Sequence, residues 1–272
     1  MMNGKKKNIK SLLRSLRQLR DQAYACYGKV TRLFQTGDEF QVIICGFPRS
    51  GSSLLYNILT ASIDDVSFVK KESSGKFYLH KKGNWLSKLP NDVFLLSDIK
   101  KLNLRGKKIL VFLLSRDIRD IITSVHQLYP DSYYIDFDQR IHGGPGLGQI
   151  YKAFEQVKSI DYGDEIKIVP ISYEDIIFNL TDLQQEVSSF IKCELLCSFD
   201  DYREKGRGLV YGSSGSSTGK YEAGPLVATR HQKWREDVHK ERILTEFRRS
   251  PELFKMLVEF GYEADNSWYD KM

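Results

Sequence analysis

Apolar residues along the chain form short runs that alternate with segments of helical periodicity. Three runs have the length and composition of strands buried on both faces of a sheet: Phe40–Cys45, Lys108–Leu114 and Ile166–Ile171. A shorter run, Val93–Leu96, is predicted to be a further strand. Beyond residue 40, helical spacing occurs in three places: from Ser52, from Asp117 to about Leu128, and near residues 173–191. This alternation predicts a single α/β domain with a mainly parallel central sheet of about five strands, flanked by helices.

The first 37 residues follow a different pattern and form a basic N-terminal arm ahead of a domain over residues 38–272. Apolar residues recur in the arm at helical spacing: Ile9, Leu12, Leu13, Leu16, Leu19, Ala23 and Tyr27. We expect an amphipathic helix over residues 7–34. Such a helix either packs on its own domain or contacts a membrane surface or another protein.

Most of the net charge lies in this arm. Residues 1–20 carry seven Lys and Arg and no acid, and the whole chain has a formal charge of +6, so the other 34 basic and 35 acidic residues nearly balance. A nucleic-acid binder is expected to spread positive charge over its working face, and the domain lacks such an excess. The sequence therefore argues against nucleic acid as a partner.

The composition is that of a folded domain without a metal or disulfide framework. Of 272 residues, 41% are hydrophobic and 28% charged, and no run approaches the roughly 20 apolar residues of a membrane span. The four cysteines, Cys26, Cys45, Cys193 and Cys197, show neither zinc-ligand nor disulfide spacing. We expect no bound metal and a reducing, cytoplasmic location, with any membrane association made through the arm.

Gly46–Ser53 carries the clearest chemical signal, between the first predicted strand and the first predicted helix. Glycines let backbone amides turn toward an anion, and a helix start adds unpaired N–H groups and the positive end of its dipole. The spacing approaches the P-loop pattern GxxxxGK[ST], but Ser52 stands where that pattern has lysine, and the nearby cation is Arg49. The segment predicts an anion-binding loop in a P-loop-like fold and argues against ATP or GTP hydrolysis.

Pro48–Leu55 resembles the 5′-phosphosulfate loop of the sulfotransferase family that uses 3′-phosphoadenosine-5′-phosphosulfate (PAPS). Many soluble members carry Lys where this chain has Arg49, whereas tyrosylprotein and many bacterial members carry Arg. Thr is common in the family at the two positions that are serine here. The resemblance implies that the 5′ end of PAPS is bound by Arg49, Ser50, Gly51, Ser52 and Ser53.

PAPS is anionic at both ends, so a second anchor is expected. Ser115–Ser124 follows a predicted strand and is similar to the family's 3′-phosphate motif, an Arg at the strand end and a Ser eight residues later, matched by Arg116 and Ser124. Ligands of open α/β sheets collect at the carboxyl ends of strands, which fits this position. Asp117 and Asp120 are expected to cap the following helix and to hold Arg119.

Two further segments resemble the family. Tyr173 lies in a stretch similar to the family's YEDL segment, whose Tyr often touches the adenine, although ordinary core packing would explain it equally well. Gly219 and Lys220 match a late loop that closes over the 3′-phosphate and is followed by a Trp, here Trp234. This loop lies in Gly206–Pro225, one of two long stretches without periodicity; the other is Tyr129–Gly148.

Transfer to a hydroxyl requires a group that accepts its proton. Glu72 lies about as far beyond the loop as the catalytic Glu of the tyrosylprotein and glycosaminoglycan branches, so the resemblance implies Glu72 as the base. His80 and His126 are alternatives, because many members that act on small molecules use His. Lys100 resembles a Lys that some carbohydrate-modifying members place near the acceptor.

The sequence thus predicts an enzyme that transfers a sulfuryl group from PAPS, a co-substrate, to a hydroxyl of a carbohydrate or another metabolite. Glycans, lipids and peptides are the candidate acceptors. Two alternatives stay open. One is a P-loop nucleotide kinase in which Asp117 holds Mg²⁺, and the other is a catalytically inactive nucleotide-binding or membrane-docking protein.

Overall fold

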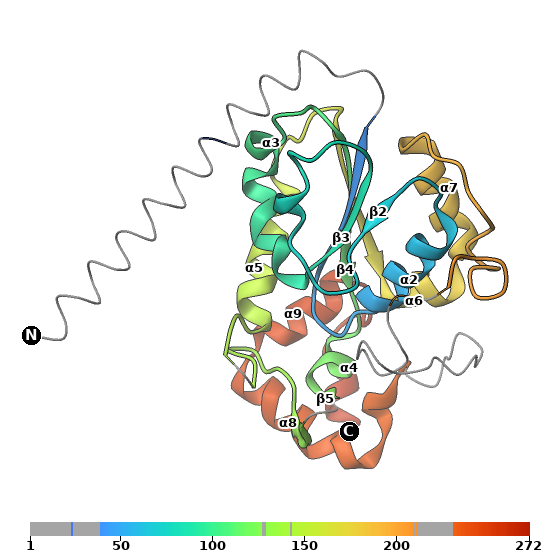
Figure 1. Ribbon diagram of the computed structural model, residues 1–272. Helices are drawn as coiled ribbons and strands as arrows, with labels where there is room; N and C mark the ends of the chain where they lie inside the picture. Colours follow the sequence, from blue (N-terminus) through green and yellow to red (C-terminus); the bar gives the residue numbers. More distant parts are fainter. Residues whose placement is uncertain (1–22, 24–38, 127–128, 142, 209, 211–230) are drawn as a thin grey trace, which may run out of the picture.

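A five-stranded parallel sheet forms the centre of the molecule (Figure 1). The computed structural model describes residues 23, 39–126, 129–141, 143–208, 210 and 231–272. The strand order is β2-β3-β1-β4-β7, and the strands are β1 (Phe40–Gly46), β2 (Ser67–Phe68), β3 (Trp85–Lys88), β4 (Lys108–Ser115) and β7 (Ile166–Ser172). All neighbouring pairs are parallel. The predicted α/β domain with a parallel sheet of about five strands is confirmed.

Helices cover both faces of the sheet (Figure 1). One face carries α2 (Ser52–Ser62), α6 (Tyr173–Phe178) and α7 (Leu180–Phe190), and the other carries α5 (Leu147–Lys158), the 3₁₀ helix η2 (Pro90–Asp98) and α3 (Ile99–Leu102). Alternation along β1 explains both cores. Val42 and Ile44 pack with the α2 side, and Ile43 and Cys45 pack with the α5 side.

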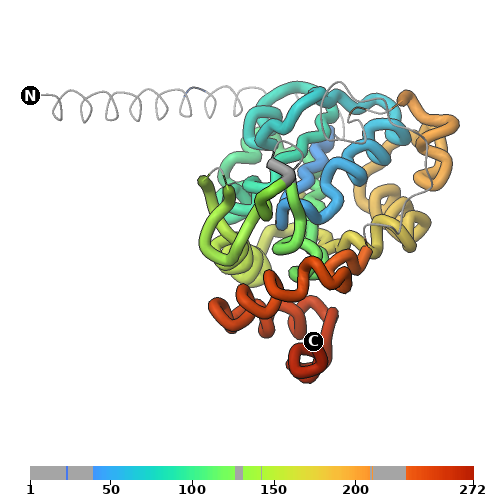
Figure 2. Tube along the Cα trace, turned by 90° about the horizontal axis from the view of Figure 1, so that it is seen from below, coloured from blue at the N-terminus to red at the C-terminus, as the bar shows by residue number. Residues whose placement is uncertain are grey.

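The C-terminal segment adds a helical cap beside the α5 face. It comprises the 3₁₀ turns η4 (Lys233–Arg235) and η5 (Asp237–His239) and the helices α8 (Lys240–Arg249), α9 (Glu252–Glu259) and α10 (Ser267–Asp270). Phe247 and Met256 from this segment belong to the same buried cluster as Ile43, so the cap shares the domain core. Figure 2 shows the cap running along one side of the molecule. No helix in the described part of the chain is long and apolar enough to cross a membrane.

The prediction of a strand over Val93–Leu96 was wrong. This run lies in η2, which begins at Pro90. Val93 and Leu96 are buried, whereas Phe94 between them is 44% exposed, so the apolar positions follow a period of three rather than two. The strands that lie between β1 and β4 in the chain are β2 and β3. They have two and four residues, which is too few for a sequence pattern to reveal a strand.

The helix predicted from Asp117 to about Leu128 is much shorter. It is α4 (Ile118–Ile122), and the Thr123 hydroxyl closes its end by donating to the carbonyl of Arg119 at 2.7 Å. The chain then forms β5 (Val125–His126), which pairs antiparallel with β6 (Tyr129–Tyr133) inside the stretch predicted to be loop. Ser124 therefore lies between a helix end and a strand.

Candidate active site

The loop after β1 forms an open turn at the carboxyl edge of the sheet. The Phe47 N–H donates to the Leu114 carbonyl at 2.9 Å, and the buried Ser50 hydroxyl donates to the Phe47 carbonyl at 2.5 Å. Arg49 and Gly51 adopt left-handed backbone angles, with φ of 64° and 85°. The N-cap residue of α2 is Gly51, which has no side chain to bond the first N–H groups of the helix, so these donors are available to a ligand. This geometry suits an anion.

Gly51 is required at its position by the side chain that packs against it. A Cβ atom on Gly51 would lie 2.7 Å from Cδ2 of Tyr173. Tyr173 begins α6, whose start is fixed by a capping box in which Ser172 and Asp175 exchange hydrogen bonds. The guanidinium carbon of Arg116 lies 4.3 Å from the centre of the Tyr173 ring. Tyr173 thus joins the loop to Arg116, and it is buried, at 6% exposure.

The two predicted anion anchors meet at this edge. Nε of Arg49 donates to the Ser124 hydroxyl at 2.7 Å, and a terminal nitrogen of Arg116 donates to the Arg49 carbonyl at 3.1 Å. Arg49 and Ser124 are 75 residues apart in the chain. The parallel pairing of β1 with β4 explains the contact, because both strands end at the same edge.

Asp120 holds Arg116 in place. Its side chain is 1% exposed and accepts from Arg116 at 3.0 Å, from the Gln232 N–H at 3.0 Å and from the Trp234 N–H at 3.1 Å. A buried carboxylate is stable only with such donors. The chain after residue 230 is therefore attached directly beside Arg116. Gly219 and Lys220 lie outside the described residues.

Asp117 has the role predicted for it. Its carboxylate caps α4 by accepting from the Arg119 N–H, and both of its oxygens also accept from the Arg119 guanidinium. Arg119 in turn lies 3.8 Å from the centre of the Trp234 ring and forms an ion pair with Glu263. The predicted contact between Asp120 and Arg119 is not seen, because the Asp120 carboxylate pairs with Arg116 instead.

Glu72 lies beside a buried lysine that the sequence did not single out. Nζ of Lys88, the last residue of β3, is 3.1 Å from a Glu72 carboxylate oxygen and 2.9 Å from the Ser53 hydroxyl. The Lys88 side chain is 3% exposed and that of Glu72 is 50% exposed. Burial lowers the pKa of Lys88, and the charge of Glu72 opposes that shift. The available signal was a lysine that ends a short apolar stretch, Trp85–Lys88, directly before Leu89 and Pro90.

His80 and Lys100 lie away from this cluster. Burial and the nearby charges of Lys81, Lys107 and Arg105 lower the pKa of His80, which places it near the start of β4. Nζ of Lys100 donates to the Asp161 carbonyl at 3.4 Å, just ahead of β7. Both positions are at the amino edge of the sheet, roughly 20 Å from the loop across the length of β4. The structure does not bring them to the candidate site.

The backbone of His126 lies near the candidate site. It follows Val125, whose carbonyl accepts from Arg49 at 3.4 Å. Of the predicted residues within the described part of the chain, the structure therefore gathers the loop residues, Arg116, Ser124, Tyr173 and Glu72 at one edge. Ser50 serves the turn through its hydroxyl, and Ser53 contacts Lys88.

Comparison with known proteins decides the family. The model of the sulfotransferase domain matches residues 39–205. The chain belongs to the sulfotransferase family. This match covers the loop, Glu72, Lys88 and the Arg116–Ser124 segment of the sulfotransferase, and no curated protein matches the chain.

Solved structures of sulfotransferases are similar to it at low identity. One is the sulfotransferase domain from the curacin biosynthetic pathway, with 12% identity and a TM-score of 0.42, covering 78% of this chain and 98% of that one. Another is mouse sulfotransferase SULT7A1 complexed with PAP, with 12% identity and a TM-score of 0.40, covering 84% of this chain and 90% of that one.

The family match makes the chain a sulfotransferase enzyme, and the Mg²⁺ ligand that the kinase alternative requires is engaged elsewhere. Asp117 would have to leave its two-oxygen ion pair with Arg119 to hold Mg²⁺. Within the ranges that the structure describes, no three His, Cys, Asp or Glu side chains are grouped to hold a metal ion.

Proposed function

We propose that this sulfotransferase moves the sulfuryl group of PAPS to a hydroxyl of its acceptor. The observation that carries the proposal is the contact between the two anion anchors, at 2.7 Å from Arg49 to Ser124 and 3.1 Å from Arg116 to the Arg49 carbonyl. A donor with a 5′-phosphosulfate and a 3′-phosphate needs two neighbouring positive sites at one edge of the sheet. An ordinary nucleoside triphosphate needs only one.

The residues suit an in-line displacement. The acceptor oxygen bonds to sulfur while the bond from sulfur to the bridging phosphate oxygen breaks, and negative charge grows on the departing adenosine bisphosphate. Arg49, Lys88 and the uncapped start of α2 are positioned to meet that charge. Burial strengthens the effect of Lys88, because a charge in a low-dielectric site is poorly screened.

Glu72 is the proposed base that takes the proton of the acceptor hydroxyl. It lies 3.1 Å from Lys88, so the group that receives the proton is adjacent to the group that stabilises the leaving charge. The side chain is half exposed, which leaves room for an acceptor to approach from solvent. A carbohydrate hydroxyl fits such an open position, since the rest of a glycan would remain outside the domain.

A transfer screen tests the proposal. The protein is incubated with PAPS and panels of glycans, lipids and peptides, and the products are analysed by mass spectrometry for added sulfate. We expect one panel to be sulfated by the wild type and by neither Arg49→Ala nor Arg116→Ala. Tight binding of adenosine 3′,5′-bisphosphate without transfer to any panel would instead indicate an inactive nucleotide-binding protein.

A further inference from the structure

The sheet lacks part of a covering layer over β7 on the α5 face. Val111 and Leu113 of β4 point to this face and are buried, at 0% and 1% exposure. Their partners on the neighbouring strand β7 are less covered: Ile168 is half-buried and Pro170 is exposed. The opposite face of β7 is covered, because Val169 packs with the cluster that contains α7 residues. An apolar strip one strand wide is thus left open.

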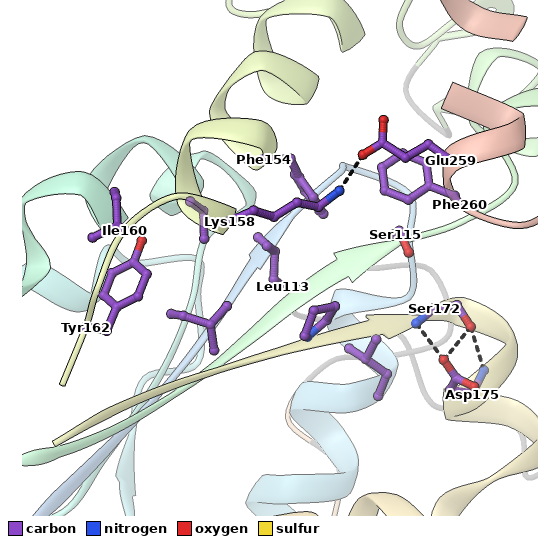
Figure 3. Close-up of a pocket in the computed structure, with 14 residues that line it drawn as sticks. Leu113, Ser115, Phe154, Lys158, Ile160, Tyr162, Ser172, Asp175, Glu259 and Phe260 are labelled. Atoms are coloured by element: carbon purple, nitrogen blue, oxygen red, sulfur yellow. Dashed lines mark hydrogen bonds and ion pairs between the residues drawn. The ribbon is translucent and has the colours of Figure 1, made fainter. Parts of the chain in front are cut away.

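A cavity of about 630 Å³ lies over this strip. Figure 3 shows Phe154 and Lys158 from α5, Leu113 from β4 and Phe260 from the end of α9 around it, with Lys158 paired to Glu259 at one end. The cavity lies two strands away from Lys88 and Glu72, across β1 and β4. It is therefore separate from the proposed acceptor position.

The connection at the amino end of the cavity carries an excess of acids. The connection before β7 holds three exposed acids, Asp161, Asp164 and Glu165, against one contacting cation, Lys100, whose Nζ donates to the Asp161 carbonyl at 3.4 Å. Tyr162 lines the cavity from the same connection and is only 9% exposed. An apolar partner that carries cations would match the open strip and this acidic connection.

The N-terminal arm has the matching chemistry. Its apolar residues recur at helical spacing from Ile9 to Leu19, and its first 20 residues carry seven cations and no acid. As a helix, Ile9 to Leu19 would span about 15 Å, and the β7 residues that line the cavity, from Ile168 to Ser172, span about 13 Å. The length of the apolar stretch in the arm therefore matches the open strip of β7, and the positive charge of the arm is opposite to that of the acidic connection.

The arm joins the domain close to the acidic connection. The Glu39 carbonyl accepts from the Lys108 N–H at 3.0 Å, and the Glu165 carbonyl accepts from the Ile109 N–H at 2.8 Å. The end of the arm and the acidic connection thus flank the start of β4, about 10 Å apart. Residues 20–38 are ample to bridge that distance. Ala23, which is helical and exposed, lies in this bridging part.

We propose that residues 9–19 dock in this cavity as an amphipathic helix. Leu12, Leu16 and their apolar neighbours cover Ile168 and Pro170, and the arm cations face the acidic connection of β7. Docking completes the layer over β7. The contact residues Ile168 and Pro170 lie outside the proposed active site, which adjoins the other end of the cavity at Ser115 and Ser172.

Zero-length cross-linking of the full chain tests the docking. A carbodiimide joins lysine amines to carboxylates in contact, and peptide mass spectrometry locates the links. We expect links within one chain between arm lysines and Asp161, Asp164 or Glu165. They should be lost in Leu12→Lys/Leu16→Lys, which adds lysines but removes the apolar contact. The matched control Ser11→Lys/Gln18→Lys adds the same charge on the polar side of the helix and should retain them.

A variant in the cavity provides a second test of the docking. Ile168→Lys, at a half-buried position, should also abolish the links while the melting temperature shows that the domain is folded. Links that persist in Leu12→Lys/Leu16→Lys would overturn the proposal. So would links found only in covalent dimers, which indicate a second copy. Absence of links together with Leu12-dependent binding to phosphatidylserine vesicles would assign the arm to a membrane surface.

Discussion

At the scale of single residues, the buried lysine at the end of β3 determines how the site is arranged. A lysine that is 3% exposed is costly unless it is paired, and Lys88 has both Glu72 and Ser53 within 3.1 Å. Ser53 belongs to the first turn of α2, and Glu72 lies in the connection before β3. Lys88 therefore fixes the distance between the proposed base and the anion-binding loop.

Glu72→Gln should separate chemistry from donor binding. The amide oxygen of Gln can still accept from Lys88, but it cannot take a proton, so we expect kcat to fall by about a hundredfold or more. The Kd for adenosine 3′,5′-bisphosphate, measured by calorimetry, should be unchanged. Unaltered turnover would move the base to another residue, with His126 the next candidate at this edge.

Lys88→Met should remove charge stabilisation near the leaving group. The substitution keeps the apolar stem and loses the contacts to Glu72 and Ser53, so we expect kcat to fall by about 10² to 10³. Lys101→Met is the matched control. Its side chain is 82% exposed and forms only a surface ion pair with Asp98, so its kinetics should equal those of the wild type. Equal losses in both variants would contradict a role for Lys88 in the chemistry.

At the scale of secondary-structure elements, the start of α2 depends on contact between Gly51 and α6. Gly51→Ala and Gly83→Ala both place a side chain at positive φ, 85° and 81°, which costs about 1–2 kcal/mol. Only at Gly51 does the new Cβ also meet Tyr173, at 2.7 Å; at Gly83 it meets nothing within 4 Å. We expect Gly51→Ala to lose more unfolding free energy in urea and also to weaken binding of adenosine 3′,5′-bisphosphate. Equal losses for the two variants would show that the contact is unimportant.

The 3₁₀ helix η2 should give the fold a pH dependence through Asp92. The buried carboxylate of Asp92 accepts from the Gly75 N–H at 2.7 Å, and burial raises the pKa of this group to about 6. The folded pKa lies above the unfolded value of about 4, so the carboxyl contributes stability below about pH 4 that is lost as the pH rises through about 6. The unfolding free energy of the wild type, relative to Asp92→Asn, should fall between about pH 4 and 7. A constant difference would contradict the assignment.

The elements that the sequence predicted are those whose pattern is long enough to be unambiguous. β1, β4 and β7 have seven or eight residues, mostly apolar, and the loop between β1 and α2 carries its own glycine signal. β2 and β3 are too short for that, and η2 has apolar residues at a period that a four-residue window cannot distinguish from a strand. Since β3 was missed, Lys88 at its carboxyl end was missed with it.

At the scale of the whole molecule, the site is assembled from segments far apart in the chain. Asp120 joins Arg116 to residues 232 and 234, and Arg119 joins α4 to Glu263 near the C-terminus. The sequence could predict that both motifs follow strands, and hence that they share an edge. It could not predict which carboxylate holds which arginine, because α4 presents Asp117 and Asp120 to different partners.

The proposed function requires one donor that bridges the Arg49 and Arg116 anchors, and calorimetry tests this most directly. The wild type is titrated with adenosine 3′,5′-bisphosphate and with 5′-AMP, which lacks the 3′-phosphate. We predict that the bisphosphate binds about a hundredfold more tightly and that Arg116→Ala removes most of this preference. Equal affinity for the two nucleotides in the wild type, or a preference that survives in Arg116→Ala, would contradict the account.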